Sequence, residues 1–170
     1  RDYMMDYTSL NDQVNRLASA LSDLGVKKGD RVAVLLPNCI PIVVAYYAIL
    51  QLGAIAVMNN PVYSNRELTY QFNDSGSSVL ICLDSLANRM IGLRPSTRIK
   101  HIIYASISDY SIPENYEAPA PVQDAENVYA YKELVASAHA DPPEVGVNWE
   151  DTAILQYTGG TTGLSKAAVL

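Results

Sequence analysis

Residues 31–58 read RVAVLLPNCIPIVVAYYAILQLGAIAVM, and the arginine at the start is the only charged residue among them. The short β-branched run at 31–36 ends at a Pro-Asn pair, which predicts a buried strand. The apolar run at 40–52 is long enough for a helix, and Pro41 suits its first turn. A further short apolar run, at 54–58, predicts the next strand. This alternation, with near-continuous apolar strands, is typical of a parallel sheet covered by helices on both faces.

The same alternation extends outward from this stretch in both directions. Before it, Thr8 or Ser9 is placed to cap a helix whose apolar residues fall at helical spacing: Leu10, Val14, Leu17, Leu21 and Leu24. After it, Ser64 and Glu67 have the spacing of a capping box, which starts a helix that ends near 73–76. We further expect strands at 78–83, 99–104 and 152–156, helices at 84–93 (with Asp84 as its cap) and 129–138, and an irregular surface excursion over 106–127. The predicted fold class is α/β, with a mostly parallel sheet flanked by helices.

Composition narrows the classes of function. The 170-residue chain is long enough for one ordinary domain with a hydrophobic core, and 49% apolar with 18% charged residues is globular usage. The net charge of -6 argues against a broad nucleic-acid-binding face, because phosphate backbones need clustered Lys and Arg. It leaves room for a small local anion site. Cys39 and Cys82 lie in apolar surroundings without metal-type spacing, so we expect free thiols in a reducing compartment and no metal ligands.

One stretch resembles a membrane span at first sight. Residues 32–65 carry no charge, and a spanning helix needs about 20 apolar residues. Eight breakers interrupt the stretch: Pro37, Asn38, Pro41, Gln51, Gly53, Asn59, Asn60 and Pro61. The pieces between them suit buried strands and helices better than a span. A membrane-embedded protein is kept as an alternative, which predicts partition into detergent.

The segment that carries chemistry is 157–166, with the sequence YTGGTTGLSK. A predicted strand delivers the chain to three glycines, three threonines and a lysine. Glycines let the backbone bring several N–H groups close to one phosphate, hydroxyls add donors, and the lysine adds positive charge. The spacing differs from a Walker loop, because Gly163 and Lys166 are not adjacent. Phosphate binding is favoured, and a glycine-rich hairpin turn with an incidental lysine is the alternative.

This segment resembles the signature loop of the adenylate-forming superfamily, which includes acyl-CoA synthetases, luciferases and peptide-synthetase adenylation domains. The family loop is approximately aromatic-Thr-Ser-Gly-Thr-Thr-Gly-x-Pro-Lys-Gly. Seven positions match it: Tyr157, Thr158, Gly160, Thr161, Thr162, Gly163 and Lys166. Gly159 replaces the common serine, as in long-chain fatty acyl-CoA synthetases, and Ser165 replaces the usual proline. Ala167 replaces a glycine, and a methyl group there would strain any backbone that needs positive φ.

Further matches upstream extend the resemblance over essentially the whole chain, more weakly between 105 and 147. They lie, in family order, at 15–18, 24–32, 51–54, 59–61, 67–68 and 73–76. The resemblance implies that residues 1–170 are the N-terminal portion of the large domain of an adenylate-forming enzyme, ending just after the ATP phosphate loop. Neither end resembles a natural terminus, so we expect a piece of a longer protein that is inactive alone.

The resemblance also implies roles. An AMP-forming fatty acid–CoA ligase joins a carboxylate to the α-phosphate of ATP, releases pyrophosphate and passes the acyl group to coenzyme A. The implied ATP-binding residues are Thr158, Gly159, Gly160, Thr161, Thr162, Gly163 and Lys166, with Lys166 and Thr162 in catalytic roles. Mg²⁺ should accompany ATP, held by a glutamate downstream of the loop, so no metal ligand is assigned here.

Several questions stay open in the sequence. The alternatives are a sibling that activates acetate, an aryl acid or an amino acid, and a truncated non-catalytic module. The expected partners are ATP, a carboxylic acid and coenzyme A, and no nucleic acid. The expected location is the cytoplasm. Peripheral contact with a membrane and the oligomeric state are left open. His101 and His139 suit a core and a surface position respectively, and neither is assigned chemistry.

Overall fold

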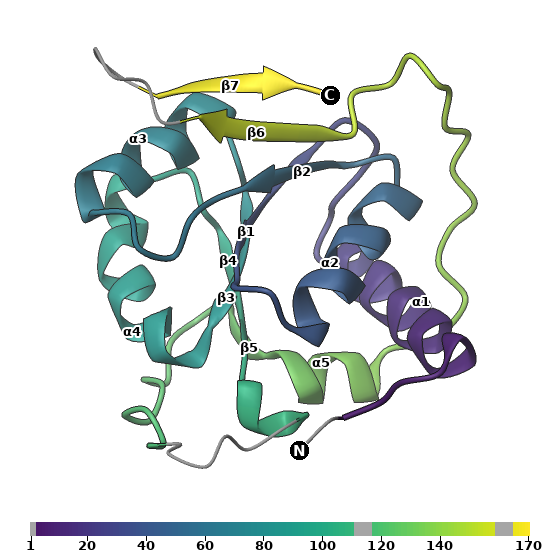
Figure 1. The fold of residues 1–170 in the computed structure, drawn as a ribbon, viewed down its shortest axis with the longest axis horizontal. Helices are drawn as coiled ribbons and strands as arrows, with labels where there is room; N and C mark the ends of the chain where they lie inside the picture. The colour runs from purple at the N-terminus through teal and green to yellow at the C-terminus, as the bar shows by residue number, and fades with distance from the viewer. Residues whose placement is uncertain (1–2, 111–116, 159–164) are drawn as a thin grey trace.

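A sheet with helices on both faces forms the body of the molecule (Figure 1). The computed structural model describes residues 3–110, 117–158 and 165–170. Its strands are β1 (Arg31–Leu35), β2 (Ile55–Met58), β3 (Val79–Leu83), β4 (His101–Ala105), β5 (Val128–Ala130), β6 (Ile154–Thr158) and β7 (Lys166–Val169). They lie in the order β5-β4-β3-β1-β2-β6-β7, and all neighbours are parallel except β6 and β7. The predicted fold class is confirmed.

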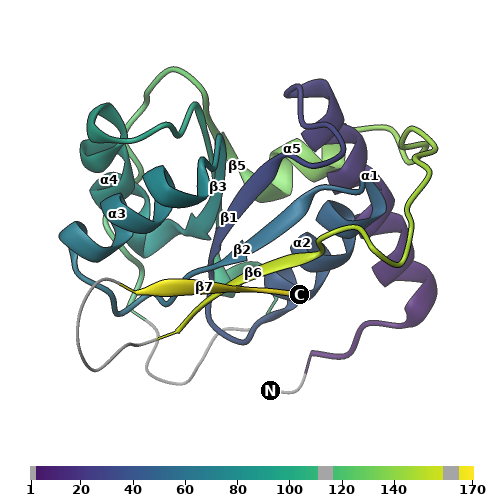
Figure 2. The same ribbon diagram turned by 90° about the horizontal axis from the view of Figure 1, so that it is seen from above.

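Two helical layers enclose the sheet. Helices α1 (Tyr7–Asp23), α2 (Ile40–Gln51) and α5 (Tyr131–Ser137) cover one face, and α3 (Asn65–Ser75) and α4 (Asp84–Leu93) cover the other (Figure 2). Two short 3₁₀ turns, Arg94–Ser96 and Ile107–Asp109, complete the described elements. Because side chains alternate along a strand, Val32 and Val34 of β1 join the core beneath α1 and α2. Ala33 and Leu35 of the same strand join the core beneath α3 and α4. This double burial explains the unbroken apolar run in the sequence.

After β2, the next strand is added on the opposite side of β1, so the direction in which the sheet grows reverses. Helix α2 links β1 to β2 on one face, and α3 then links β2 to β3, on the far side of β1, across the other face. Crevices at such reversals, at the carboxyl ends of the strands, are where open α/β sheets bind ligands. Strand β6 lies beside β2 and parallel to it. The residues that follow β6 therefore lie at the carboxyl end of the sheet, where such crevices occur.

Helix starts follow the expected chemistry with two exceptions. Ser64 and Glu67 form the predicted capping box at α3, and Pro41 lies in the first turn of α2. The cap of α1 is Asp6, not Thr8 or Ser9, because its carboxylate accepts a hydrogen bond from the Ser9 backbone at 2.7 Å. Asp84 is the first helical residue of α4 rather than its cap, and Leu83 precedes it there.

Two strands escaped prediction. The predicted helix at 129–138 begins only at Tyr131, because residues 128–130 pair with β4 as the edge strand β5. Strand β7 turns back against β6, so Lys166 opens a strand instead of lying in a loop. Strand β5 has only three residues, too few to show a periodicity, and β7 is recognisable only from its pairing with β6.

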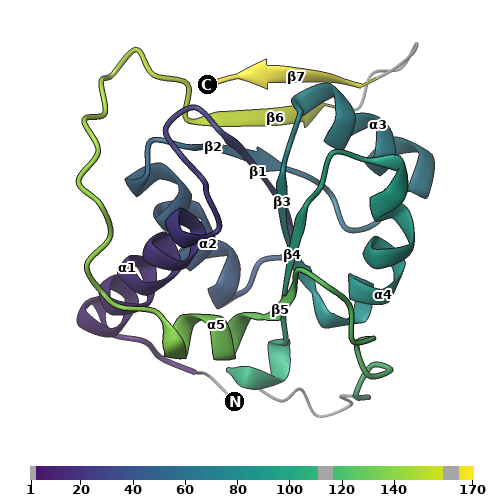
Figure 3. The same ribbon diagram turned by 180° about the vertical axis from the view of Figure 1, so that it is seen from behind.

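The connection from α5 to β6 passes along the side of the molecule that carries α1 (Figure 3). Lys28 holds its last part, with Nζ 2.6 Å from Asp151 Oδ2 and 2.8 Å from the Gly146 carbonyl oxygen. The Asn148 backbone N–H and the Lys28 ammonium lower the pKa of Asp151. This attachment fixes the start of β6. Within the described ranges, no helix combines the length and the apolar character that crossing a membrane requires.

Candidate functional site

The two ends of the glycine-rich segment are brought together by β6 and β7. Thr158, the last residue of β6, pairs with Lys166, the first of β7, and the Thr158 hydroxyl donates to the Lys166 carbonyl oxygen at 3.3 Å. Both side chains are exposed. Lys166 Nζ forms no ion pair or hydrogen bond with the described part of the chain, which leaves its ammonium available to an anion.

The remaining predicted phosphate ligands lie outside the described residues: Gly159, Gly160, Thr161, Thr162 and Gly163. Their roles stay predictions. We call the pair of Thr158 and Lys166 the neck. It determines where the segment between these two residues leaves β6 and where it joins β7. Ala167 causes no strain, because it lies in the β ladder opposite Tyr157, and Asn127 is the only described non-glycine residue with positive φ.

Tyr157 connects the β6 end of the glycine-rich segment to α3. Its side chain is 4% exposed, and its hydroxyl donates to Asp74 Oδ2 at 2.7 Å and to the Gln71 carbonyl oxygen at 3.3 Å. Burial raises the pKa of the Tyr157 phenol, and the hydrogen bond to the Asp74 carboxylate and its negative charge raise it further. The phenol therefore remains a hydrogen-bond donor at physiological pH.

Gln71 anchors the β7 end. Its Nε2 donates to Ser165 Oγ at 3.2 Å, and its Oε1 accepts from Asn59 Nδ2 at 2.7 Å. Asn59 directly follows β2, so a chain of side-chain hydrogen bonds runs from the carboxyl end of that strand to the residue before Lys166. Gln71 and Asp74 both belong to α3, which thereby contacts the flanks of the segment on both sides.

From the sequence, Asp74 was recognised only as part of the helix end near 73–76, and Gln71 was not singled out. A pattern that reveals Gln71 does exist in α3. The buried residues of that helix are Leu68, Gln71, Phe72 and Ser75, which follow one face of a helix. A glutamine on a buried face must find hydrogen-bond partners, so its position alone indicates a polar network.

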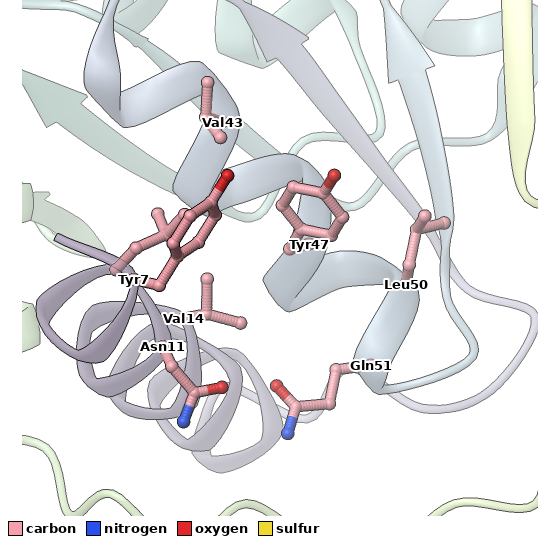
Figure 4. A pocket seen from close by; sticks show the side chains of 8 residues that line it. Tyr7, Asn11, Val14, Val43, Tyr47, Leu50 and Gln51 are labelled. Carbon is pink, nitrogen blue, oxygen red and sulfur yellow. The ribbon is translucent and has the colours of Figure 1, made fainter. Parts of the chain in front are cut away.

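A hollow of about 860 Å³ lies elsewhere, between α1 and α2, and Tyr7, Val14 and Tyr47 are among its lining residues (Figure 4). It belongs to the face opposite α3 and contributes nothing to the Thr158–Lys166 neck. His101, which was expected in the core, is only half-buried in β4 beside Tyr129, whereas His139 is exposed as expected. Among the described residues, no three His, Cys, Asp or Glu side chains gather as metal ligands would.

Comparison with known proteins places this geometry in a family. Residues 1–170 match the family described as AMP-binding enzyme. The chain belongs to that family. Membership in the AMP-binding enzymes confirms the resemblance drawn from the loop, and it agrees with the position of the neck at the carboxyl edge of the sheet.

Individual relatives agree. The long-chain-fatty-acid–CoA ligase of Bacillus subtilis is 36% identical over 172 residues, which is 91% of this chain and 30% of that protein. A long-chain-fatty-acid–CoA ligase from Archaeoglobus fulgidus superposes with a TM-score of 0.77 at 29% identity, covering 98% of this chain and 30% of that one. The anthranilate CoA ligase AuaEII, in complex with anthranoyl-AMP, shares the fold with a TM-score of 0.82 at 24% identity, covering 97% and 29%. This chain thus spans about a third of the length of these relatives.

Proposed function

We propose that residues 1–170 form the first part of the adenylation domain of an AMP-forming fatty acid–CoA ligase. The observation that carries the proposal is the neck of the glycine-rich segment. An antiparallel pair brings Thr158 together with Lys166, whose ammonium has no ion-pair partner in the described part of the chain, at the carboxyl end of the sheet. The similarity to long-chain-fatty-acid–CoA ligases favours a fatty acid as the carboxylate over acetate, an aryl acid or an amino acid.

The proposed reaction has two steps. In the first, a carboxylate oxygen forms a bond to the α-phosphorus of ATP, and the bond between the α-phosphorus and the bridging oxygen breaks to release pyrophosphate. In the second, the thiol of coenzyme A loses its proton, its sulfur bonds to the acyl carbon, and AMP leaves. Negative charge on the departing pyrophosphate needs a nearby cation and hydrogen-bond donors.

The chain supplies those groups from the neck and the segment it closes. Lys166 would balance charge on the β- and γ-phosphates, and the Thr158 hydroxyl would donate to a phosphate oxygen. Thr161 and Thr162 would add hydroxyl donors, and Gly159, Gly160 and Gly163 backbone N–H groups. The described residues do not form a Mg²⁺ site, and we assign no step to the metal. Binding of coenzyme A and most contacts to the acyl chain are proposed for parts of the enzyme beyond this chain, which alone should form no thioester.

The ATP, coenzyme A and fatty acid of this reaction are all available in the cytoplasm, where we place the enzyme. Peripheral contact with a membrane would bring it closer to its fatty acid.

The test is fatty-acid-dependent exchange of labelled pyrophosphate into ATP by the full-length enzyme. Lys166→Ala should lower the exchange rate by about a hundredfold or more, because one lost charge contact in the transition state costs roughly 2.7–4 kcal/mol. The matched control is Lys100→Ala, which removes another exposed lysine far from the neck. Equal exchange in both variants would remove Lys166 from the mechanism. Exchange supported by acetate, aryl or amino acids but not by fatty acids would replace the substrate class, and no exchange with any carboxylate would favour a non-catalytic module.

A further inference from the structure

We call the glycine-rich residues 157–166 the phosphate segment, with Tyr157 on its β6 flank and Ser165 on its β7 flank. Helix α3 contacts both flanks. Near the β6 flank, the Tyr157 hydroxyl donates to the Gln71 carbonyl oxygen and to the Asp74 carboxylate. At the β7 flank, the Gln71 side chain donates to Ser165. Gln71 is thus the one described residue whose main chain and side chain reach opposite flanks. These flanks are eight residues apart in sequence, from Tyr157 to Ser165.

The side-chain amide of Gln71 contacts Asn59 on one side and Ser165 on the other. Asn59 donates to its Oε1 at 2.7 Å, which leaves the Nε2 donor directed to Ser165. Gln71 is 1% exposed and Asn59 is 7% exposed, so water competes little for either amide. A buried amide that is rotated the wrong way would place two donors or two acceptors against each other. The two buried amides must therefore match each other, and together they link the strand end that carries Asn59 to Ser165.

We propose that Gln71 is a positioning residue that sets the distance between the two flanks of the phosphate segment, with Ser165 as its contact. The proposal rests on the proposed function, because it concerns the placement of Lys166 toward ATP. Ser165 directly precedes Lys166, so a hydrogen bond that holds Ser165 also limits the movement of the Lys166 backbone. Small errors in the placement of a charged group are costly in phosphoryl chemistry, since its stabilising effect depends on preorganised distance.

The main variant is Ser165→Ala in the full-length enzyme. It removes the acceptor at a partly buried position and leaves the buried pair of Asn59 and Gln71 intact. We expect kcat/KM for ATP to fall about threefold to tenfold, the range that corresponds to one net hydrogen bond. The KM for the fatty acid should not change, and Ser165→Thr, which keeps the hydroxyl, should restore the wild-type value.

Gln71→Met and Ser165→Ala together form a double-mutant cycle. Because it removes the same hydrogen bond, adding Ser165→Ala to it should lower kcat/KM for ATP no further. The control is Asn73→Ala, which removes a different side-chain hydrogen bond of α3, to the Ser96 carbonyl oxygen. Asn73→Ala should leave both kinetic constants unchanged. A further readout, independent of activity, is amide hydrogen exchange of residues 165–170 without nucleotide, which should be faster in Ser165→Ala.

The outcomes separate this inference from the proposed function. If wild-type enzyme exchanges pyrophosphate and Ser165→Ala matches it in kcat/KM for ATP, Gln71 does not position the segment. A loss that Ser165→Thr fails to restore would likewise overturn the inference. If the wild-type enzyme exchanges no pyrophosphate, the proposed function fails, and hydrogen exchange at 165–170 alone decides whether Gln71 holds the flank.

Discussion

Replacing Tyr157 by phenylalanine tests how much the β6 flank depends on a single hydroxyl. The ring is buried, and phenylalanine fills the same space, so the substitution removes little packing. It deletes the donor to Asp74 Oδ2 and to the Gln71 carbonyl oxygen. The change therefore isolates hydrogen bonding from the filling of the core.

The magnitude follows from the environments of the two acceptors. A hydrogen bond to a charged group contributes about 1.5–3 kcal/mol. Asp74 is exposed, so water can replace the lost donor, and the lower end of that range applies. A loss near 1.4 kcal/mol is a factor of about ten. If the flank must be held for ATP to react, kcat/KM for ATP should fall about fivefold to tenfold, with no change in the KM for the carboxylate.

Pyrophosphate exchange by the full-length enzyme measures this effect. Tyr47→Phe is the control, because that tyrosine lies half-exposed on α2 beside the hollow of Figure 4. Asp74→Asn keeps an acceptor without the charge, so it should cost less than Tyr157→Phe. The reasoning is refuted if Tyr157→Phe lowers thermal stability yet leaves kcat/KM for ATP intact. The hydroxyl would then support only the fold.

Two further predictions concern the stability of α3, with a control in α4, to be measured by hydrogen exchange of peptides from the helix that carries each substitution. Gly76→Ala should destabilise its end by about 1–2 kcal/mol, because φ is +67° and the new Cβ would lie 2.7 Å from Arg31 Nη2. Gly92→Ala in α4, with no atom within 4 Å of its Cβ, should instead stabilise by about 0.5–1 kcal/mol, and equal signs would contradict this account. Glu67→Ala should speed exchange at neutral pH. Hydrogen bonds from Ser64 lower the pKa of Glu67 below its ordinary 4.5, so this difference should vanish as pH falls through the lowered value, and a difference that persists in acid would oppose it.

The sequence predicted elements that local chemistry specifies. Buried parallel strands need apolar residues on both faces, so β1 and β3 were visible as unbroken runs. The capping box at Ser64 and Glu67 is equally local, since both partners lie in one helical turn. Strand β7 was missed because its pairing with β6 depends on a neighbour across the intervening segment. Asp6 was missed because any of three neighbouring polar residues could cap α1.

The site was predictable only in part, for a related reason. The segment for which phosphate binding is predicted is contiguous, so its glycines, threonines and lysine were recognisable from residues 157–166. Its supports come from Asn59, Gln71 and Asp74, which are distant in sequence and meet it only through the strand order. Their chemistry is ordinary and could serve many purposes. Only the adjacency of β2 and β6 brings these three residues to the same segment, at the carboxyl end of the sheet.

That adjacency bears on why a serine can stand at position 165, where the resembling loops carry proline. Proline restricts its own φ through its ring, so its rigidity needs no neighbour. Serine has no such restriction, and an unsupported serine would give the backbone before Lys166 more freedom. The hydrogen bond from Gln71, which is itself hydrogen-bonded to Asn59, supplies an external restraint in place of the internal one. A restraint of this kind depends on the packing of α3 against the sheet. Under the proposed function, loosening α3 should therefore disturb ATP use more in the full-length protein than in a relative that carries proline at this position.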